Sequence, residues 1–261
     1  MIASIRELIK YRELLYIIAW RDIHIKYKQS VMGIMWAVLM PIIVVSAGML
    51  VKYGMSLLSG KPMDVSDFAT VSIKAVPWSF FVSSIRFSTN SLVGNSNLVT
   101  KIYFPRVIFP IASVLSQLFD FAVASCLLVV ILGFMRVGVS ALLLWVPVLL
   151  AILVLFALSI AILLSAANLF YRDVKYLVEV ILTFAIFITP VFYDVSLFGK
   201  WSRLLMLNPV APILEGLSAS VVYHCVPEVN WILYSAVVSV CLYGLAFAFF
   251  RKMEWLFAER I

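Results

Sequence analysis

Apolar residues in this chain form long runs that are separated by short charged segments. The clearest runs are residues 31–51, which are uncharged up to Lys52, residues 141–169 and residues 231–250. A helix needs about 20 mostly apolar residues to cross roughly 30 Å of hydrocarbon. We therefore expect each of the three runs to form a membrane-spanning helix.

Three less regular runs complete the pattern. Residues 107–135 carry a single charge, Asp120, and residues 177–193 are just long enough to span. Residues 68–92 are interrupted by charged residues and a proline, so they can span only where other helices shield them from lipid. With these runs the chain is predicted to form six transmembrane helices.

Composition places the whole chain in the same class. Hydrophobic residues make up 64% of it and charged residues 13%, and the mean hydropathy is +1.10, well outside the range of soluble globular domains. Membrane-spanning strands alternate apolar and polar residues and lack uncharged runs of about twenty. We expect one all-α integral membrane domain over residues 1–261, without a soluble domain or an internal repeat.

Basic residues indicate how the spans are oriented. With a cytoplasmic N-terminus and six spans, fourteen of the twenty Lys and Arg residues fall on or near the cytoplasmic side, as the positive-inside rule demands. Both termini, including the tail 251–261, are then cytoplasmic. The net charge of +7 follows from this topology, so no nucleic-acid partner is needed to explain it.

Two cytoplasmic segments are candidates for a function. Residues 1–29 are predicted to contain an amphipathic interface helix, because apolar residues from Ile5 to Ile23 recur near helical spacing. A plain topology anchor attracted to anionic lipid would show the same pattern. Residues 96–110 (SNLVTKIYFPRVIFP) combine basic and aromatic residues, which favours a short helix that docks into a partner over rings that rest on the bilayer.

One external segment, residues 194–230, precedes the last span. It holds two short apolar stretches that are broken by charges and prolines and are too short to span twice. Re-entrant helices fit this pattern, since irregular backbone at membrane depth is tolerated where it is buried or lines a cavity. We expect an external gate here, and a simple extracellular cap is the alternative.

Asp120 is the most informative isolated charge. It lies about 13 residues into its span, near mid-membrane, where ionised groups are costly and usually paired. Arg86 is the expected partner. A structural ion pair and a proton relay both fit this position, and the lack of His or Glu neighbours favours the ion pair.

Enzyme chemistry is not visible in the sequence. A Walker A loop needs G-x-x-x-x-G-K-[ST], and the nearest match, from Gly54 to Gly60 and Lys61, is one residue too long and is followed by Pro62. The histidines and cysteines show no metal-ligand spacing. We expect no catalytic residue, metal or cofactor in this chain, so its energy comes from a partner, an ion gradient or a membrane-bound donor.

Four stretches resemble one known family. RDIHIKYKQSVMGIMWAVLMPI (residues 21–42), NLVTKIYFPRVIFP, NLFYRDVKYL (168–177) and ITPVFYD (188–194) are similar, in order and spacing, to the membrane subunits of type-2 ABC exporters of polysaccharides. The likeness is closest to permeases that export O-antigen, a part of lipopolysaccharide, and teichoic acid. It runs from about residue 5 to residue 255.

The resemblance implies an assembly, a cargo and two cytoplasmic sites. It predicts a homodimer in the bacterial cytoplasmic (inner) membrane, two copies of an ATPase subunit that binds ATP and Mg, and a polysaccharide linked to polyprenyl phosphate. The coupling helix that seats in the ATPase corresponds to Asn97, Leu98, Lys101, Tyr103, Phe104, Pro105 and Arg106. The residues near the membrane entrance correspond to Arg21, Asp22, Tyr27 and Lys28.

At the entrance, Arg or Lys could bind the phosphate of a carrier lipid by charge-assisted hydrogen bonds. Side chains that only snorkel toward the headgroups would look the same.

A sliding polymer needs flat apolar surfaces and weak repeated contacts, which aromatic rings supply. We place the conduit in the irregular spans that contain Pro41 and Pro190. The candidates for its wall are Trp36, Trp78, Phe80, Phe81, Phe87, Phe187, Phe192 and Tyr193. Helix packing and membrane aromatic belts would also produce 14% aromatic residues.

Two other functions stay open. A self-sufficient secondary transporter or lipid flippase needs no ATPase, but such proteins usually show a paired repeat with polar sites at the midplane. A membrane enzyme of lipid-linked glycan synthesis needs clustered acidic or His residues at one face. Dependence on a partner ATPase separates the exporter from the secondary transporter.

Overall fold

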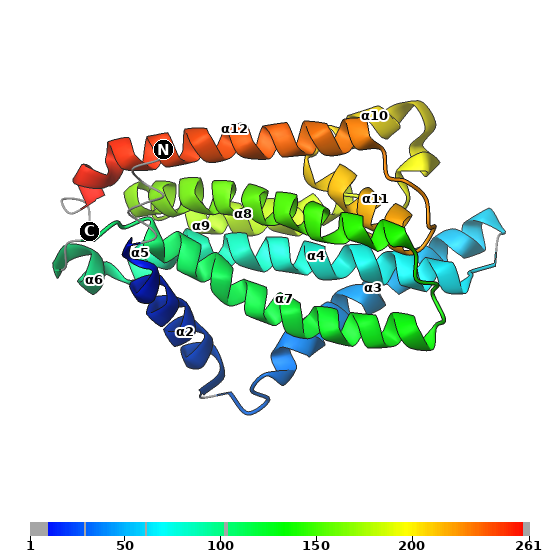
Figure 1. Cartoon of the computed structure of the whole chain (residues 1–261), viewed down its shortest axis with the longest axis horizontal. Coiled ribbons are helices and arrows are strands. Elements are labelled where there is room, and N and C mark those ends of the chain that lie inside the picture. Colours follow the sequence, from blue (N-terminus) through cyan, green and yellow to red (C-terminus); the bar gives the residue numbers. More distant parts are fainter. Residues whose placement is uncertain (1–9, 29, 61, 102–103, 258–261) are drawn as a thin grey trace.

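The computed structural model describes residues 10–28, 30–60, 62–101 and 104–257, and within these ranges every regular element is a helix (Figure 1). The predicted all-α class is confirmed. In chain order the elements are α2 (Arg12–Lys28), α3 (Met35–Ser59), α4 (Val65–Thr89), α5 (Ser91–Gly94), α6 (Ser96–Lys101), α7 (Ile108–Phe134), η1 (Ala141–Leu144), α8 (Trp145–Phe170), α9 (Val174–Ile188), η2 (Val195–Trp201), α10 (Ser202–Met206), α11 (Val210–Val221), α12 (Val229–Met253) and η3 (Glu254–Leu256).

The long helices run side by side, so the bundle has two ends. The helices α5, α6 and η3 lie at one end, on the left of Figure 1, and α10, α11 and the end of α3 lie at the other. We call them the proximal end and the distal end. α2 slants along the side of the bundle near the proximal end and packs against α7.

α4 is the central helix. It packs against α3, α7, α8, α9 and α11. Of the residues in its most apolar 18-residue stretch, 78% are buried. The sequence predicted that this polar span would need shielding by other helices, and its neighbours supply that shielding. Trp78 and Phe81 of α4 join Leu149, Leu153 and Leu214 in the main hydrophobic core.

Five helices of the described chain are long and apolar enough to cross a membrane. They coincide with five of the six predicted spans: Met35–Leu58, Ser66–Thr89, Ile108–Phe134, Ala141–Phe170 and Val229–Leu256. The remaining run, residues 177–193, contains α9, which has 15 residues. At about 1.5 Å per residue, such a helix extends roughly 22 Å, less than the hydrocarbon thickness. The sixth span therefore stays a prediction.

α3 is longer than expected. The predicted span stopped before Lys52, but the helix continues to Ser59 and is followed by Gly60, whose φ of 67° is the left-handed conformation that glycine favours. Lys52 can lie inside the helix because its ammonium group forms ion pairs with two carboxylates, those of Asp67 at 2.7 Å and Asp194 at 3.4 Å.

The region between α9 and α12 consists of short helices. Residues 194–230 form η2, α10 and α11 at the distal end, and α11 is buried over most of its length against α4, α8 and α12. The broken apolar pattern predicted short helices here because prolines and charges interrupt it. The gate role of these helices stays a prediction.

Within the predicted interface region, residues 1–9 and 29 lie outside the described part of the chain, and α2 covers residues 12–28. α2 buries Ile18 and Ala19 against the bundle and leaves Tyr16, Ile17 and Trp20 exposed. Apolar side chains thus lie on two faces of α2, one toward protein and one that suits a lipid headgroup region.

Candidate functional site

Four helices, α3, α4, α7 and α9, enclose a cavity of about 510 Å³, and Lys26 near the end of α2 reaches into it. We call it the aromatic cavity. Its aromatic side chains are Trp36, Trp78, Phe80, Phe87 and Phe121, and its polar ones are Lys26, Ser79, Ser83, Arg86, Gln117, Asp120 and Thr183. The polar groups are few among apolar ones, as in most small-molecule sites.

Half of the aromatic residues predicted for a conduit wall line this cavity, namely Trp36, Trp78, Phe80 and Phe87. The other four lie elsewhere. Phe81 stacks on Phe156 in the core, with ring centroids 5.8 Å apart. Phe187 is exposed and Phe192 is buried, and the Tyr193 hydroxyl donates a hydrogen bond to the Phe187 carbonyl (2.9 Å).

Asp120 is paired with α2, and the predicted pairing with Arg86 is wrong. Its carboxylate forms an ion pair with Lys26 and accepts a hydrogen bond from the Tyr27 hydroxyl. Lys26 also donates to the Gln117 side-chain oxygen (3.2 Å). The partners therefore come from a helix outside the long spans, and the pattern of spans carries no information on where that helix docks.

Arg86 pairs with Glu179 of α9, and its Nε lies 2.8 and 3.0 Å from the two carboxylate oxygens. Both side chains are 46% exposed. Lys26 is also close to an aromatic ring, with its Nζ 4.9 Å from the centroid of Phe87. The aromatic cavity thus carries two cations, each held by a carboxylate.

The predicted entrance residues make contacts within the protein. Arg21 donates hydrogen bonds to Asp22 (2.8 Å) and to the side-chain oxygen of Asn95 (2.6 Å), which links α2 to the junction of α5 and α6. Tyr27 belongs to the cluster described above, and Lys28 is exposed. Binding of a lipid phosphate by these residues stays a prediction.

The predicted coupling segment consists of α6 and the turn into α7. Asn97 is exposed, and Pro105 is partly buried. Leu98 packs against a second hydrophobic cluster, which includes Leu92 and Phe109. Lys101 is the last residue of α6, and Tyr103 lies outside the described residues. The segment contains the expected short helix at the proximal end, and its docking to a partner stays a prediction.

Two residues of this segment hold the fold together. A residue that seats in the ATPase would be exposed, but Phe104 is buried against Phe109, with ring centroids 5.4 Å apart. The Arg106 backbone N–H donates to a carboxylate oxygen of Glu254 (2.8 Å), and its guanidinium donates to the Glu254 carbonyl (2.7 Å). The turn is therefore tied to the C-terminal end of α12, a contact that no local pattern indicates.

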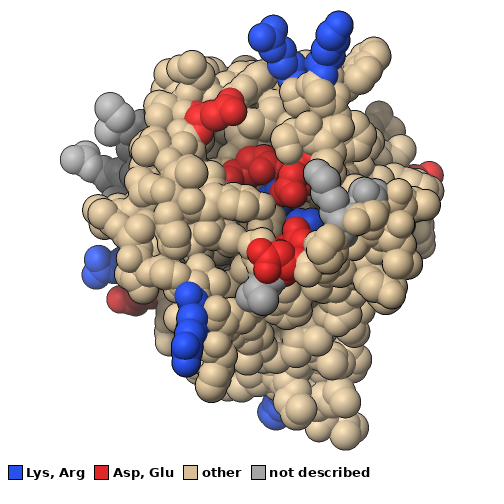
Figure 2. All heavy atoms as spheres, turned by 90° about the vertical axis from the view of Figure 1, so that its right-hand side faces the viewer, with Lys and Arg blue, Asp and Glu red and all other residues tan. Residues whose placement is uncertain are grey.

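The distal half of the bundle holds a network of two lysines and three carboxylates. Lys74 is fully buried and donates to Glu215 (2.9 Å) and Asp194 (3.1 Å). Lys52 pairs with Asp67 and Asp194. We call these five residues the distal charge network, and it joins α3, α4, α11 and the segment after α9. Figure 2, which views the molecule from its distal end, shows acidic side chains gathered around a hollow.

Asp194 lies between α9 and η2 and is the centre of this network. Burial raises the pKa of its carboxyl, but the charges of Lys74 and Lys52 together outweigh burial and hold the pKa below its usual value. Asp194 is therefore ionised at neutral pH. The sequence did not predict the network, although a lysine inside an apolar run, such as Lys74, signals that a carboxylate partner exists.

Comparison with known proteins gives a consistent family. A family model described as an ABC-2 type transporter matches residues 13–222. The chain is similar to an O-antigen export system permease protein RfbA of Myxococcus xanthus, at 30% identity over 269 residues that cover 100% of each chain. It is also similar to two proteins of that name from Klebsiella pneumoniae, at 28% and 26% identity, over 95% of this chain and 94% of theirs.

Proposed function

We propose, since this chain belongs to the ABC-2 type transporter family, that it is the channel-forming permease of an exporter that moves a lipid-linked polysaccharide across the bacterial cytoplasmic membrane. The observation that carries this proposal is the similarity, over the full length of both chains, to a permease named for O-antigen export. The cargo is a cell-surface glycan carried on polyprenyl phosphate.

The energy source follows from the family. An ABC-2 membrane subunit is a multi-pass permease without the ATPase, and a separate ABC subunit binds and hydrolyses ATP. The sequence agrees, because its nearest approach to a Walker A loop has the wrong spacing. A self-sufficient secondary transporter is therefore the weaker candidate.

The aromatic cavity suits the entry of a lipid-linked glycan. Trp36 and Phe87 offer flat apolar faces to sugar rings and to the carrier chain. Lys26 and Arg86 lie beside them with their charges already held by carboxylates. A phosphate bound here would accept charge-assisted hydrogen bonds from these two side chains. In the empty cavity the carboxylates balance both cations, so no unpaired charge is buried.

Two copies of the chain are proposed to form the conduit between them. The support comes from the side of the bundle where α4 meets α9, because the Arg86–Glu179 pair there is half exposed. Ionised side chains of membrane helices face a bundle interior or a water-filled cavity far more often than lipid tails. A second copy on this side would cover the pair and complete an aqueous wall.

Transport by the purified complex tests the proposal. The chain and its ATPase partner, reconstituted into vesicles, should move a lipid-linked glycan on addition of ATP and Mg. A matched complex, whose ATPase has a substituted Walker A lysine, should show none. Movement that continued without the ATPase, or that followed an ion gradient, would identify a secondary transporter or flippase.

A second experiment addresses the coupling segment. Replacement of Phe104 and Arg106 would disturb the fold, because both make internal contacts. Asn97→Arg changes an exposed residue of α6, and we expect it to reduce co-purification of the ATPase. Tyr171→Arg, exposed in the loop after α8, is the control and should leave co-purification intact. Equal recovery with both variants would argue against docking at α6.

A further inference from the structure

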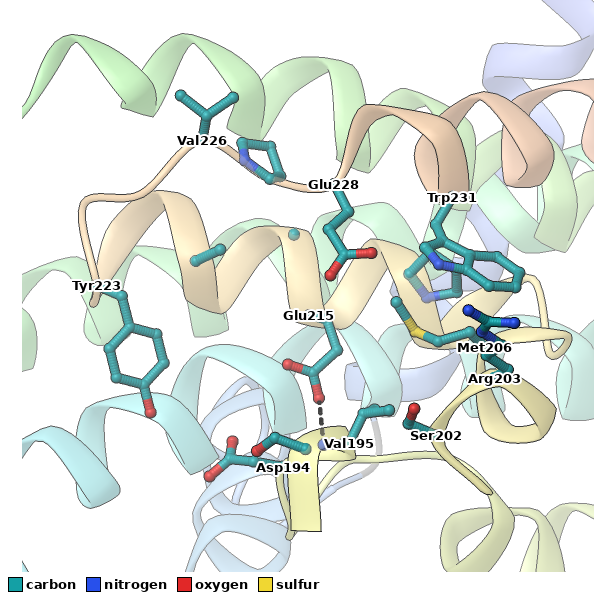
Figure 3. Close-up of a pocket in the computed structure, with 15 residues that line it drawn as sticks. Asp194, Val195, Ser202, Arg203, Met206, Glu215, Tyr223, Val226, Glu228 and Trp231 are labelled. Carbon is teal, nitrogen blue, oxygen red and sulfur yellow. Dashed lines mark hydrogen bonds between the residues drawn. The ribbon is translucent and has the colours of Figure 1, made fainter. Parts of the chain in front are cut away.

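A second cavity, of about 460 Å³, lies at the distal end between η2, α10, α11 and the start of α12 (Figure 3). It shares no lining residue with the aromatic cavity, and its volume is within the ~300–1,000 Å³ range of small-molecule sites. We call it the distal pocket. Its charged and aromatic lining residues are Asp194, Arg203, Glu215, Tyr223, Glu228 and Trp231.

Carboxylate oxygens of Glu215 and Glu228 face this pocket, and the Glu215 carboxylate is held in place. The Glu215 Oε1 atom accepts hydrogen bonds from the Lys74 Nζ (2.9 Å) and the Val195 backbone N–H (3.2 Å), so the second oxygen is held toward the open space (Figure 3). Glu228 points its carboxylate into the same space. Carboxylates accept strong hydrogen bonds from hydroxyl and amine groups.

Aromatic rings flank the carboxylates on opposite sides, Tyr223 on one and Trp231 on the other (Figure 3). The Trp231 ring meets Tyr234 edge to face, with centroids 5.9 Å apart, and the Tyr234 hydroxyl donates to the Leu207 carbonyl (2.9 Å). The indole therefore packs against a ring that is itself tied to the α10 end of the pocket. An apolar ring face beside hydroxyl-binding groups is the combination that a sugar ring requires.

The hydrogen-bonding groups of the lining decide which sugars the pocket can accept. Three of its lining residues are carboxylates and one, Arg203, is a cation. Lys74 is fully buried behind Glu215, so it orients that carboxylate and cannot reach a ligand. Asp194 and Glu215 are paired with Lys52 and Lys74 behind the lining, so the carboxylates act on a ligand mainly as hydrogen-bond acceptors. Phosphate or carboxylate groups on a ligand bring no donor and would meet acceptor oxygens, whereas hydroxyl and amine groups would find partners.

We propose that the distal pocket is a binding subsite for one uncharged or amino sugar unit of the exported polysaccharide as it leaves the conduit. This inference rests on the proposed function, because that function supplies the glycan and places the distal end outside. The subsite would hold the emerging chain at the far end of the bundle from the aromatic cavity, with weak contacts that permit release.

Saturation-transfer NMR on the purified permease–ATPase complex tests the subsite directly. The probes are methyl mannoside, glucosamine and, as the anionic comparison, glucuronic acid. We expect the first two to bind and glucuronic acid to bind at least about tenfold more weakly. Glu228→Gln and Trp231→Ala should each weaken binding of the neutral probe by about fivefold or more. Trp201→Ala changes an exposed aromatic residue of the same end, outside the pocket lining, and should have no effect.

The outcomes separate the subsite from the proposed function. If ATP-driven glycan transport is intact and no probe binds, or if Glu228→Gln and Trp231→Ala leave binding unchanged, the subsite is wrong and the function stands. Preferential binding of glucuronic acid would also overturn the subsite. If the probes bind as expected but the complex fails to transport any lipid-linked glycan, the proposed function is wrong.

Discussion

Asp120 holds the end of α2 against the middle of α7 through Lys26 and Tyr27. Its removal leaves an ammonium group without its counter-ion in a mostly apolar cavity. We expect Asp120→Asn to weaken the attachment of α2 by about 1–3 kcal/mol and to reduce export. Hydrogen–deuterium exchange should show faster exchange of the amides in α2, with the other helices unaffected.

Glu179→Gln is the matched control for this change, because it also removes a carboxylate that holds a cation beside the aromatic cavity. The Arg86–Glu179 pair is half exposed, and such pairs contribute less than about 1 kcal/mol. Exchange in α2 should stay at the wild-type rate. Unchanged exchange in the Asp120→Asn variant as well would show that Asp120 does not anchor α2.

The ionisation of Asp194 gives the distal charge network a pH dependence. Folding lowers the pKa of this carboxyl, so ionised Asp194 stabilises the folded state. This stabilisation is complete above the unfolded-state pKa of about 4, and it is lost as the pH falls through the lower pKa of the folded state. Wild type should therefore exceed Asp194→Asn in melting temperature at pH 7, and the difference should shrink below about pH 4. A difference that is constant between pH 7 and pH 3 would contradict this assignment.

Individual residues also show what the sequence can and cannot predict. It identified Asp120 as a paired charge, because an ionised group in an apolar run requires a partner. It chose the wrong partner, since Arg86 was the nearest basic residue in a span, whereas Lys26 approaches from outside the spans. The charges that interrupt residues 68–92 include Lys74. Its partners could not be predicted, because its carboxylates lie 120 and 141 positions away in sequence.

Among the helices, α3 shows how close packing depends on a missing side chain. A Cβ atom at Gly48 would lie 2.5 Å from the Phe192 ring and 2.7 Å from Val71. We expect Gly48→Ala to destabilise the protein by about 1–3 kcal/mol, the usual effect of overpacking. The measurement is the melting temperature of the protein in detergent.

Gly54→Ala in the same helix provides the comparison, because a Cβ at Gly54 meets nothing within 4 Å. Alanine has the higher helix propensity, so this variant should be neutral or slightly stabilising. Equal destabilisation by both substitutions would point to the helix itself and not to its contact with Phe192.

Helices differ in how far their sequences predict them. Long apolar runs with at most one charge specified α3, α7, α8 and α12, because few structures besides a spanning helix can hold them in a bilayer. The central position of α4 was predictable from its polar residues, which need protein neighbours. The buried packing of α11 was not predictable. Its neighbours in space are α4, α8 and α12, and the sequence of one short helix does not indicate which other helices it contacts.

At the scale of the whole molecule, α2 connects the proximal end to the aromatic cavity. Arg21 binds Asn95 beside the predicted coupling segment, and Lys26 of the same helix reaches the cavity. We expect Arg21→Ala and Asn95→Ala each to lower the ratio of glycan transported to ATP hydrolysed. When the changes in this ratio are expressed as free energies, the effect of the double variant should differ from the sum of the two single effects by about 0.5–3 kcal/mol, as for residues in contact.

The control for this cycle combines Arg21→Ala with Trp201→Ala at the other end of the bundle. Those two changes share no contact and should be additive within about 0.5 kcal/mol. Additive behaviour of the Arg21 and Asn95 variants would mean that their hydrogen bond plays no part in linking hydrolysis to transport.

The burial of Lys74 has a consequence for how the chain is made. α4 leaves the ribosome long before Asp194 and Glu215 are synthesised, yet its lysine needs both carboxylates to lose contact with water. Until α11 is complete, Lys74 lacks both carboxylates, and an unpaired ammonium group at membrane depth is costly. We therefore expect α4 to take its final place among the other helices only after α11 has been made.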